Sequence, residues 1–257
     1  MNLGIKGQLF IVGGATSGFG KAIAHQLLEE GARVIAIART DKALQELYAN
    51  NPLVQCVVAD LGADTDTAIE ACKKLIGNQQ LHGIVINAGG PPAKTVLETT
   101  LADWDHAYQL LLRWKVAFTQ AFIPQMIQHG YGRFVFIESY TVKQPLENLV
   151  LSNSLRAAVV GMVKTLSQEV GKSGVTLNIM GPGSHNTPAI NRIYQKKAEQ
   201  TGLSFEEVKA AALSQIPVGF LGEADDFAGL ALWLLSPHSR YITGQTIMVD
   251  GGTIKGV

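Results

Sequence analysis

The sequence predicts a doubly wound α/β fold, in which helices cover both faces of a parallel sheet of seven strands. Apolar stretches of strand length alternate with helical patterns from one end of the chain to the other. A glycine-rich turn separates the first strand from the first helix. No Pro/Gly/Ser-rich linker, charge run, low-complexity tract or internal repeat divides the chain. We therefore interpret residues 1–257 as a single domain.

The strands are identified by short apolar runs. The first is predicted at residues 9–12, and the helix after it repeats apolar residues at helical spacing between Ile23 and Leu28. The other strands are predicted at Val34–Ala38, Val54–Ala59, Gly83–Asn87, Arg133–Glu138, Thr176–Met180 and Thr246–Val249. The clearest helical patterns are Leu101–His129, Ser154–Lys172 and Ala224–Leu235. A ligand is expected beyond the carboxyl ends of the strands, near the point where the strand order reverses.

Composition excludes several classes of protein. Lys and Arg together number 21, as do Asp and Glu, so the net charge gives no reason to expect nucleic acid or an anionic membrane as a partner. No apolar run approaches the ~20 residues of a membrane span, and the N-terminus lacks the pattern of a signal peptide. Cys56 and Cys72 are predicted to be reduced packing residues, and no spacing of His, Cys and Asp resembles a metal site. We expect a cytoplasmic protein.

The glycine-rich turn carries the clearest functional signal. Residues 13–20 read Gly-Gly-Ala-Thr-Ser-Gly-Phe-Gly, directly after a predicted buried strand and at the start of a predicted helix. In this context backbone N–H groups and the helix dipole point at an anion. The turn therefore predicts a site for the pyrophosphate of a dinucleotide.

Several motifs in order resemble the classical short-chain dehydrogenase/reductase family over nearly the whole chain. Matches to that family are Gly14, Gly18 and Gly20; Asp60, as the acid that contacts adenine; Asn87–Gly90; Asn178, Pro182, Gly183 and Thr187, in the segment that holds the nicotinamide carboxamide; Tyr241–Gln245; and Asp250–Gly252. The resemblance implies a Rossmann-like fold, a nicotinamide cofactor, a small carbonyl or alcohol substrate and a homotetramer.

The resemblance also implies individual sites. With Arg39, the residues expected to bind the cofactor are Gly14, Ser17, Gly18, Phe19, Gly20, Asp60, Leu61, Asn87, Gly89, Arg156, Pro182, Gly183 and Thr187. Residues 187–215 correspond to the substrate lid of the family, and their apolar pattern fits either two packed short helices or a mobile flap. A stripe at Leu110, Trp114, Phe118 and Phe122 fits either a subunit interface or ordinary core.

The end of the second strand bears on cofactor choice. Enzymes that use NAD place a carboxylate there to accept from the ribose hydroxyls. This chain has Ala38 followed by Arg39, and a guanidinium would attract a 2′-phosphate. We therefore predict NADP(H), with NAD(H) as the alternative if Arg39 is only a solvated surface residue. Ser17 stands where many NADP-preferring relatives have a second basic residue.

The catalytic positions depart from the family. Its members use a tyrosine as proton donor, a lysine four residues later, a serine that positions substrate, and an asparagine that holds a water in the proton relay. Ser139 matches the serine. The tyrosine and lysine positions hold Ser152 and Arg156, and Leu111 stands in place of the asparagine.

These replacements leave two functions open. An alkyl hydroxyl is a far weaker acid than a phenol, whose pKa is about 10. A guanidinium stays charged and cannot pass protons on. The chain is therefore either an NADP(H)-dependent oxidoreductase with an atypical site of Ser139, Ser152 and Arg156, or a catalytically silent dinucleotide-binding sensor or regulatory protein.

Other side chains near the predicted cleft are candidates for proton transfer. Tyr140 could replace the missing phenol or pack elsewhere. His185 could act as an acid near the nicotinamide, but a solvated loop histidine is the favoured reading. Lys143 is read as an exposed loop residue, and Glu138 as either a cleft carboxylate or a buried one.

Overall fold

The computed structural model describes residues 2–87 and 89–256. Its centre is one seven-stranded sheet in the order β3-β2-β1-β4-β5-β6-β7, and every paired strand runs parallel. The strands are β1 Leu9–Gly13, β2 Arg33–Ala38, β3 Val54–Val58, β4 Gly83–Ile86, β5 Gly132–Ile137, β6 Val175–Pro182 and β7 Thr246–Val249. The predicted fold class is confirmed, with strand ends that differ from the prediction by one or two residues.

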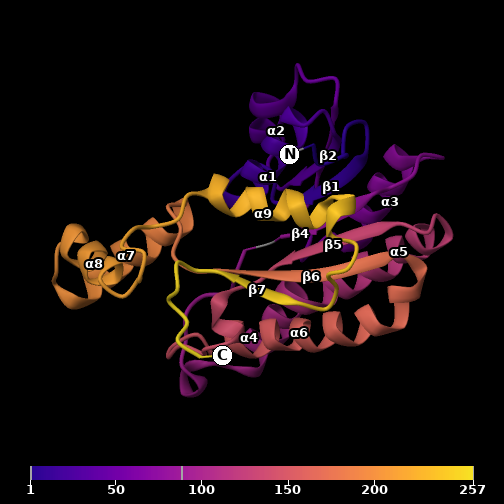
Figure 1. Ribbon diagram of the computed structural model, residues 1–257. Coiled ribbons are helices and arrows are strands. Elements are labelled where there is room, and N and C mark those ends of the chain that lie inside the picture. Colours follow the sequence, from indigo (N-terminus) through magenta and orange to yellow (C-terminus); the bar gives the residue numbers. More distant parts are fainter. Residues whose placement is uncertain (1, 88, 257) are drawn as a thin grey trace.

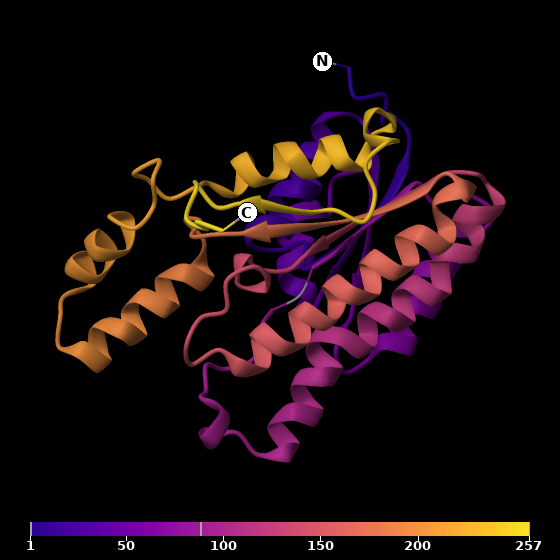
Figure 2. The same ribbon diagram turned by 60° about the horizontal axis from the view of Figure 1, so that its bottom comes forward.

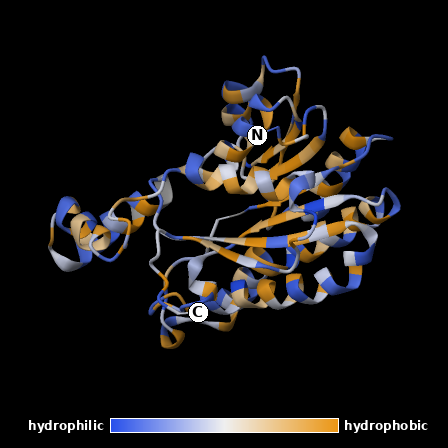
Figure 3. Cartoon of the chain, viewed as in Figure 1, coloured by the Kyte–Doolittle hydropathy of each residue, from blue (hydrophilic) through white to orange (hydrophobic). Residues whose placement is uncertain are grey.

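Helices cover both faces of the sheet (Figure 1). They are α1 Gly18–Glu29, α2 Asp41–Tyr48, α3 Thr65–Ile76, α4 Leu101–Tyr108, α5 Trp114–Gln128, α6 Val150–Val170, α7 Pro188–Thr201, α8 Phe205–Leu213 and α9 Ala224–Leu235. Side chains alternate along β1, so that Leu9 and Ile11 pack with α3, α5 and α6, whereas Phe10 and Val12 pack with α1, α2 and α9. Figure 3 shows the hydrophobic residues concentrated on the strands and on the inward sides of the helices.

The helix predicted at Leu101–His129 is not continuous. A π-helical turn, Gln109–Arg113, separates α4 from α5. Three residues of the apolar stripe on this segment belong to the core, because Trp114, Phe118 and Phe122 are at most 2% exposed and successive rings are in contact, with centroids 5.7 and 5.4 Å apart. Leu110, the fourth, is only half-buried. The helix predicted from Ser154 begins earlier, at Val150.

The segment that the sequence assigns to a lid forms α7 and α8, which extend away from the sheet (Figures 1 and 2). The two helices share a small apolar cluster of their own around Tyr194, Ala198 and Val208. The chain leaves and returns at one place, where the N–H of Asn186 donates to the carbonyl of Gly222 at 2.8 Å. Among the helices that the structure describes, none is both long enough and apolar enough to cross a bilayer.

Candidate functional site

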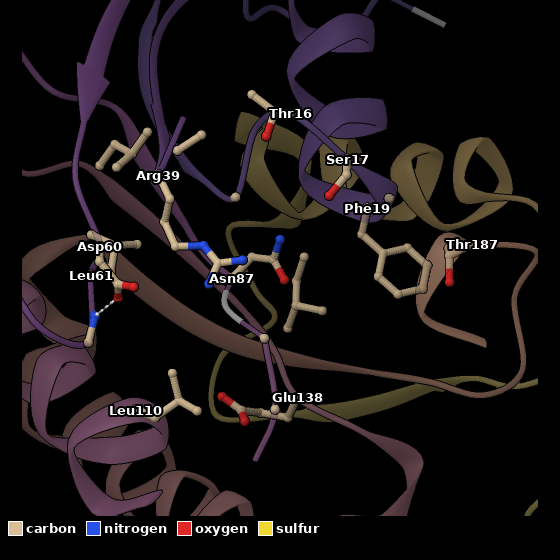
Figure 4. A pocket seen from close by; sticks show the side chains of 18 of the residues that line it. Thr16, Ser17, Phe19, Arg39, Asp60, Leu61, Asn87, Leu110, Glu138 and Thr187 are labelled. Atoms are coloured by element: carbon tan, nitrogen blue, oxygen red, sulfur yellow. Dashed lines mark hydrogen bonds between the residues drawn. The ribbon is translucent and has the colours of Figure 1, made fainter. Parts of the chain in front are cut away.

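A cavity of about 650 Å³ opens at the carboxyl ends of the central strands, at the point where the strand order reverses between β1 and β4 (Figure 4). Its wall is formed by Gly14, Thr16, Ser17, Gly18, Phe19, Ile37, Ala38, Arg39, Ala59, Asp60, Leu61, Gly62, Asn87, Gly89, Gly90, Leu110, Ile137, Glu138, Arg156, Pro182 and Thr187. Most of the residues that the sequence predicts to bind a cofactor therefore lie on one surface. Ala88, inside one predicted motif, lies outside the described residues.

The glycine turn is built so tightly that side chains are excluded. Gly14 has a φ of 63°, and a Cβ there would lie 2.8 Å from Nδ2 of Asn87. A Cβ on Gly20 would lie 2.3 Å from the carbonyl oxygen of Gly14. Asn87 closes the turn by donating Nδ2 to the carbonyl of Gly13 at 3.2 Å. Gly20 is thus a packing residue behind the cavity, and the space in front of the turn stays free for an anion at the N-terminus of α1.

The two sides of the cavity differ in polarity. On one side Arg39 extends from the end of β2, and its exposed side chain forms no salt bridge with any residue that the structure describes (Figure 4). Asp60 is held by its own loop, since Oδ1 accepts from the N–H of Gly62 at 3.0 Å. On the other side, Pro182 and Thr187 form the wall. Gly183 sits behind them, where a Cβ would lie 2.7 Å from Cα of Asp250.

The two predicted catalytic serines lie half-buried, beside the cavity wall rather than in it. Ser139 caps a short 3-10 turn, and its Oγ accepts from the N–H and the hydroxyl of Thr141 at 3.2 and 3.0 Å. Ser152 accepts from Nε of Arg156 at 3.1 Å. Each hydroxyl accepts bonds from neighbours that are donors, so each keeps its own proton for donation.

An ionic cluster of three residues adjoins these serines, and sequence reasoning missed one of them, Lys115. Lys115 of α5 donates to Oε1 of Glu138 at 2.5 Å, and Nη1 of Arg156 donates to Oε2 at 2.9 Å. The three residues are 1%, 4% and 7% exposed. The sequence left Glu138 as either a cleft carboxylate or a buried one, and the structure shows both, because the residue is buried and also borders the cavity.

The pKa of Lys115 is lowered to about 8, chiefly by burial and also by the neighbouring Arg156 cation, although Glu138 acts in the opposite direction. The signal for this residue was present in the sequence. Lys115 follows Leu111 and precedes Thr119 by one helical turn each, on the buried face of α5. A lysine at such a position needs a buried partner.

The other candidates for proton transfer differ in how far they are buried. His185 is 4% exposed, so the expectation of a solvated loop residue was wrong. Its ring packs edge-on against both Phe19 and Phe227, which also contact each other, and its Nδ1 lies 3.2 Å from the carbonyl oxygen of Gly183. Burial lowers its pKa, which favours the neutral ring. Lys143 is exposed, as expected.

Tyr140 remains a candidate donor at the lid side of the site. It is half-buried in the 3-10 turn after Ser139. Burial raises its pKa, and the nearby Tyr194 and Asp250 raise it further. Leu111, in contrast, is fully buried inside the π-helical turn and offers no polar atom to hold a water.

Comparison with known proteins agrees with this geometry. Residues 14–253 match the family model described as enoyl-(acyl carrier protein) reductase. The subunit BbsD of (2S)-((R)-hydroxy(phenyl)methyl)succinyl-CoA dehydrogenase from Thauera aromatica is 30% identical over 256 residues, which cover 97% of this chain and 98% of that protein.

Two solved structures superpose over the full length of both chains. The L-sorbose reductase of Gluconobacter frateurii, in complex with NADPH and L-sorbose, has a TM-score of 0.92 at 25% identity and full coverage, 100% of each chain. A putative NAD(P)-dependent gluconate 5-dehydrogenase from Beutenbergia cavernae, with bound NADP, has a TM-score of 0.88 at 29% identity, again over 100% of each chain.

Proposed function

The chain belongs to the short-chain dehydrogenase/reductase family, and on that premise we propose that it is an NADP(H)-dependent oxidoreductase of carbonyl or alcohol substrates. One observation carries the proposal: a single cavity wall joins the glycine cradle at Gly14 to the guanidinium of Arg156. An anion site at one end and a buried cation at the other suit a dinucleotide laid across the sheet edge.

The fit of the cofactor rests on the cradle and on the exposed cation beside it. The glycine turn leaves no room for a Cβ at Gly14, so its backbone is open to a pyrophosphate. Arg39 borders the cavity and supports a contact to a 2′-phosphate, which favours NADP(H) over NAD(H). The two solved relatives with NADPH and NADP point in the same direction.

The chain's own residues would polarise the substrate. When bound, a reduced nicotinamide supplies the hydride for carbonyl reduction. Ser139 and Ser152 each retain a proton and would donate hydrogen bonds to the substrate oxygen, as an oxyanion hole does. Arg156 would hold the nicotinamide ribose. The proton that completes the product would come from water or from Tyr140.

A second candidate function is a catalytically silent dinucleotide-binding sensor. The pairing of Ser152 with Arg156 favours it, because an alkyl hydroxyl is a far weaker acid than a phenol and the guanidinium beside it cannot pass a proton on. The cavity and the cradle serve both functions equally. The two differ only in turnover.

The deciding experiment is NADPH consumption against ketones, quinones and diketones, beside a direct NADPH titration. Binding with turnover on at least one carbonyl is the expected result. Binding without turnover on every substrate would favour the sensor. No binding of either NADPH or NADH would contradict both functions.

We also propose that the protein is a cytoplasmic homotetramer of single-domain subunits. A groove between α5 and α6 supports one interface, lined by Val116, Gln120, Met162, Thr165 and Leu166 among others. Tyr241, fully exposed before β7, supports the second. Light scattering at micromolar concentration tests the assembly, and a monomer would contradict it.

A further inference from the structure

Three ionised side chains from three different elements meet at the cavity wall. Glu138 directly follows β5, Lys115 belongs to α5 and Arg156 to α6. The cluster carries two formal positive charges and one negative charge, and all of it is buried. Among the described residues, no second carboxylate forms a salt bridge with either cation. Such a cluster is costly to bury, so its position beside a cavity calls for an explanation.

The carboxylate fixes the orientation of the guanidinium. Nη1 of Arg156 donates to Oε2 of Glu138 at 2.9 Å and to its main-chain carbonyl at 3.1 Å. This arrangement turns Nε toward Oγ of Ser152, 3.1 Å away. It also leaves Nη2 on the side of Gly90, where a Cβ would lie 3.6 Å from that nitrogen. Both Gly90 and Arg156 line the cavity.

We propose that Glu138 and Lys115 are positioning residues, which hold the Arg156 guanidinium with one edge on Ser152 and one edge on the cavity. The inference rests on the proposed function. Because Nε donates to Ser152, the hydroxyl proton of that serine points away from Arg156 and toward a substrate oxygen. Because Nη1 is occupied by Glu138, Nη2 is presented to the ribose hydroxyls of the cofactor.

Lys115 helps to position Arg156 because the two carboxylate oxygens of Glu138 have separate partners. Oε1 of Glu138 accepts from Lys115 and Oε2 from Arg156. Without the lysine, Oε1 would lose its hydrogen bond in a place that water does not reach, and the carboxylate would be free to rotate. The charged groups that face the lysine ammonium are Glu138, directly after β5, and Arg156 of α6. Because the pKa of Lys115 is about 8, the net charge of the cluster changes at mildly alkaline pH.

The test separates orientation from stability with two variants. Glu138→Gln keeps the shape of the side chain but leaves both Lys115 and Arg156 as buried cations without a carboxylate, so both thermal stability and NADPH affinity should fall, the affinity about tenfold. Glu138→Gln combined with Lys115→Met removes the more deeply buried of these two cations. The double variant should regain part of the lost thermal stability while its NADPH affinity stays about tenfold below that of the parent.

The measurements are NADPH affinity by fluorescence titration, thermal denaturation, and the pH dependence of the affinity between pH 6.5 and 9.5. In the parent the affinity should decrease as Lys115 loses its proton near pH 8, since a positive charge near an anionic cofactor is lost. This decrease should be absent from the double variant. Glu70→Gln, in the exposed pair with Lys73, is the matched control and should change none of the three.

Two results would overturn the positioning role. The first is a double variant that regains stability and NADPH affinity together, which would make the cluster purely structural. The second is an unchanged affinity in both Glu138 variants when Arg156→Ala binds NADPH weakly, which would leave the proposed function intact. A parent protein that binds no NADPH would overturn the proposed function as well.

Discussion

The two ends of β5 each carry a buried charged residue, and the protein satisfies the two in different ways. At the start, Arg133 donates Nη1 to the carbonyls of Gly132 and Gly174, both at 2.9 Å, and Nε to that of Ser236 at 3.2 Å. Just beyond the other end, Glu138 is bound by two buried side chains, Lys115 and Arg156. Only the second cluster borders the cavity.

The comparison shows that a buried charge can serve either the fold or a binding site. The carbonyls around Arg133 are fixed by the backbone, so the guanidinium ties β5 to the loops before β6 and after α9. Arg156 is held through a carboxylate and retains an edge toward open space. One end of the strand therefore supports the fold, and the other prepares a site.

The largest effect should come from removing the structural charge. Arg133→Met would remove the side-chain hydrogen bonds to the carbonyls of Gly132, Gly174 and Ser236, the last of which also accepts from Ser239, and should lower the free energy of unfolding by about 3–5 kcal/mol. Urea denaturation measures this loss, and NADPH titration of the folded protein should give the parent affinity. If Arg133→Met weakened NADPH binding as strongly as Arg156→Ala, the two ends of the strand would not be distinct.

The next effect concerns turnover alone. Ser152→Ala removes one donor from the substrate oxygen and should slow the reaction ~10²–10³-fold, with NADPH affinity almost unchanged. The pH–rate profile on any substrate found is the measurement. A variant that matches the parent in rate and pH dependence would make Ser152 a bystander.

Cofactor preference should depend on Arg39, at the opposite side of the cavity. Arg39→Ala should remove most of the preference for NADPH over NADH, on the order of 1.5–3 kcal/mol, because the guanidinium is the expected partner of the extra phosphate. Paired titrations with the two cofactors measure it. Equal affinities in the parent protein would contradict the choice of NADP(H).

The smallest effect is the acid dependence of stability. Burial lowers the pKa of His82, near the start of the sheet, where Nδ1 accepts from the N–H of Leu9 at 3.1 Å, and burial likewise lowers the pKa of His185 at the cavity end. The unfolded chain therefore binds more protons than the native one just below pH 6.5, and stability falls as the pH drops through that range.

His82→Asn keeps an acceptor for Leu9 but removes one titrating group, so the variant should lose less stability than the parent between pH 6.5 and 5. Chemical denaturation at a series of pH values measures this. Parallel curves for parent and variant would show that His82 does not contribute to the acid dependence.

The fold was predictable from the sequence because the strands and helices can be identified from local patterns of apolar residues. The glycine turn after β1 and the apolar run that forms β5 are short-range patterns, and their order along the chain determines the sheet edge on which they meet. The break at Gln109–Arg113 was missed, since the apolar period continues through the π-helical turn. Trp114 and Phe118 allowed both a core and an interface reading, which only packing resolved.

The candidate site was predictable only in part. Ser139, Ser152 and Arg156 follow from alignment to a motif, but the cluster with Lys115 arises where α5, β5 and α6 come together in space. The environment of His185 was misjudged for the same reason. Phe19 and Phe227, which pack against its ring, come from helices far from it in the sequence.

The base of the α7–α8 excursion has a consequence for how the chain tolerates change. Its ends are pinned together by the bond between Asn186 and Gly222, and its apolar cluster is separate from both cores of the sheet. Because none of the strand pairings of the sheet involves this segment, we expect changes inside the α7–α8 cluster to leave the register of every strand unchanged. As the predicted substrate lid, the excursion is also where we expect substrate preference to change while the nucleotide site stays as it is.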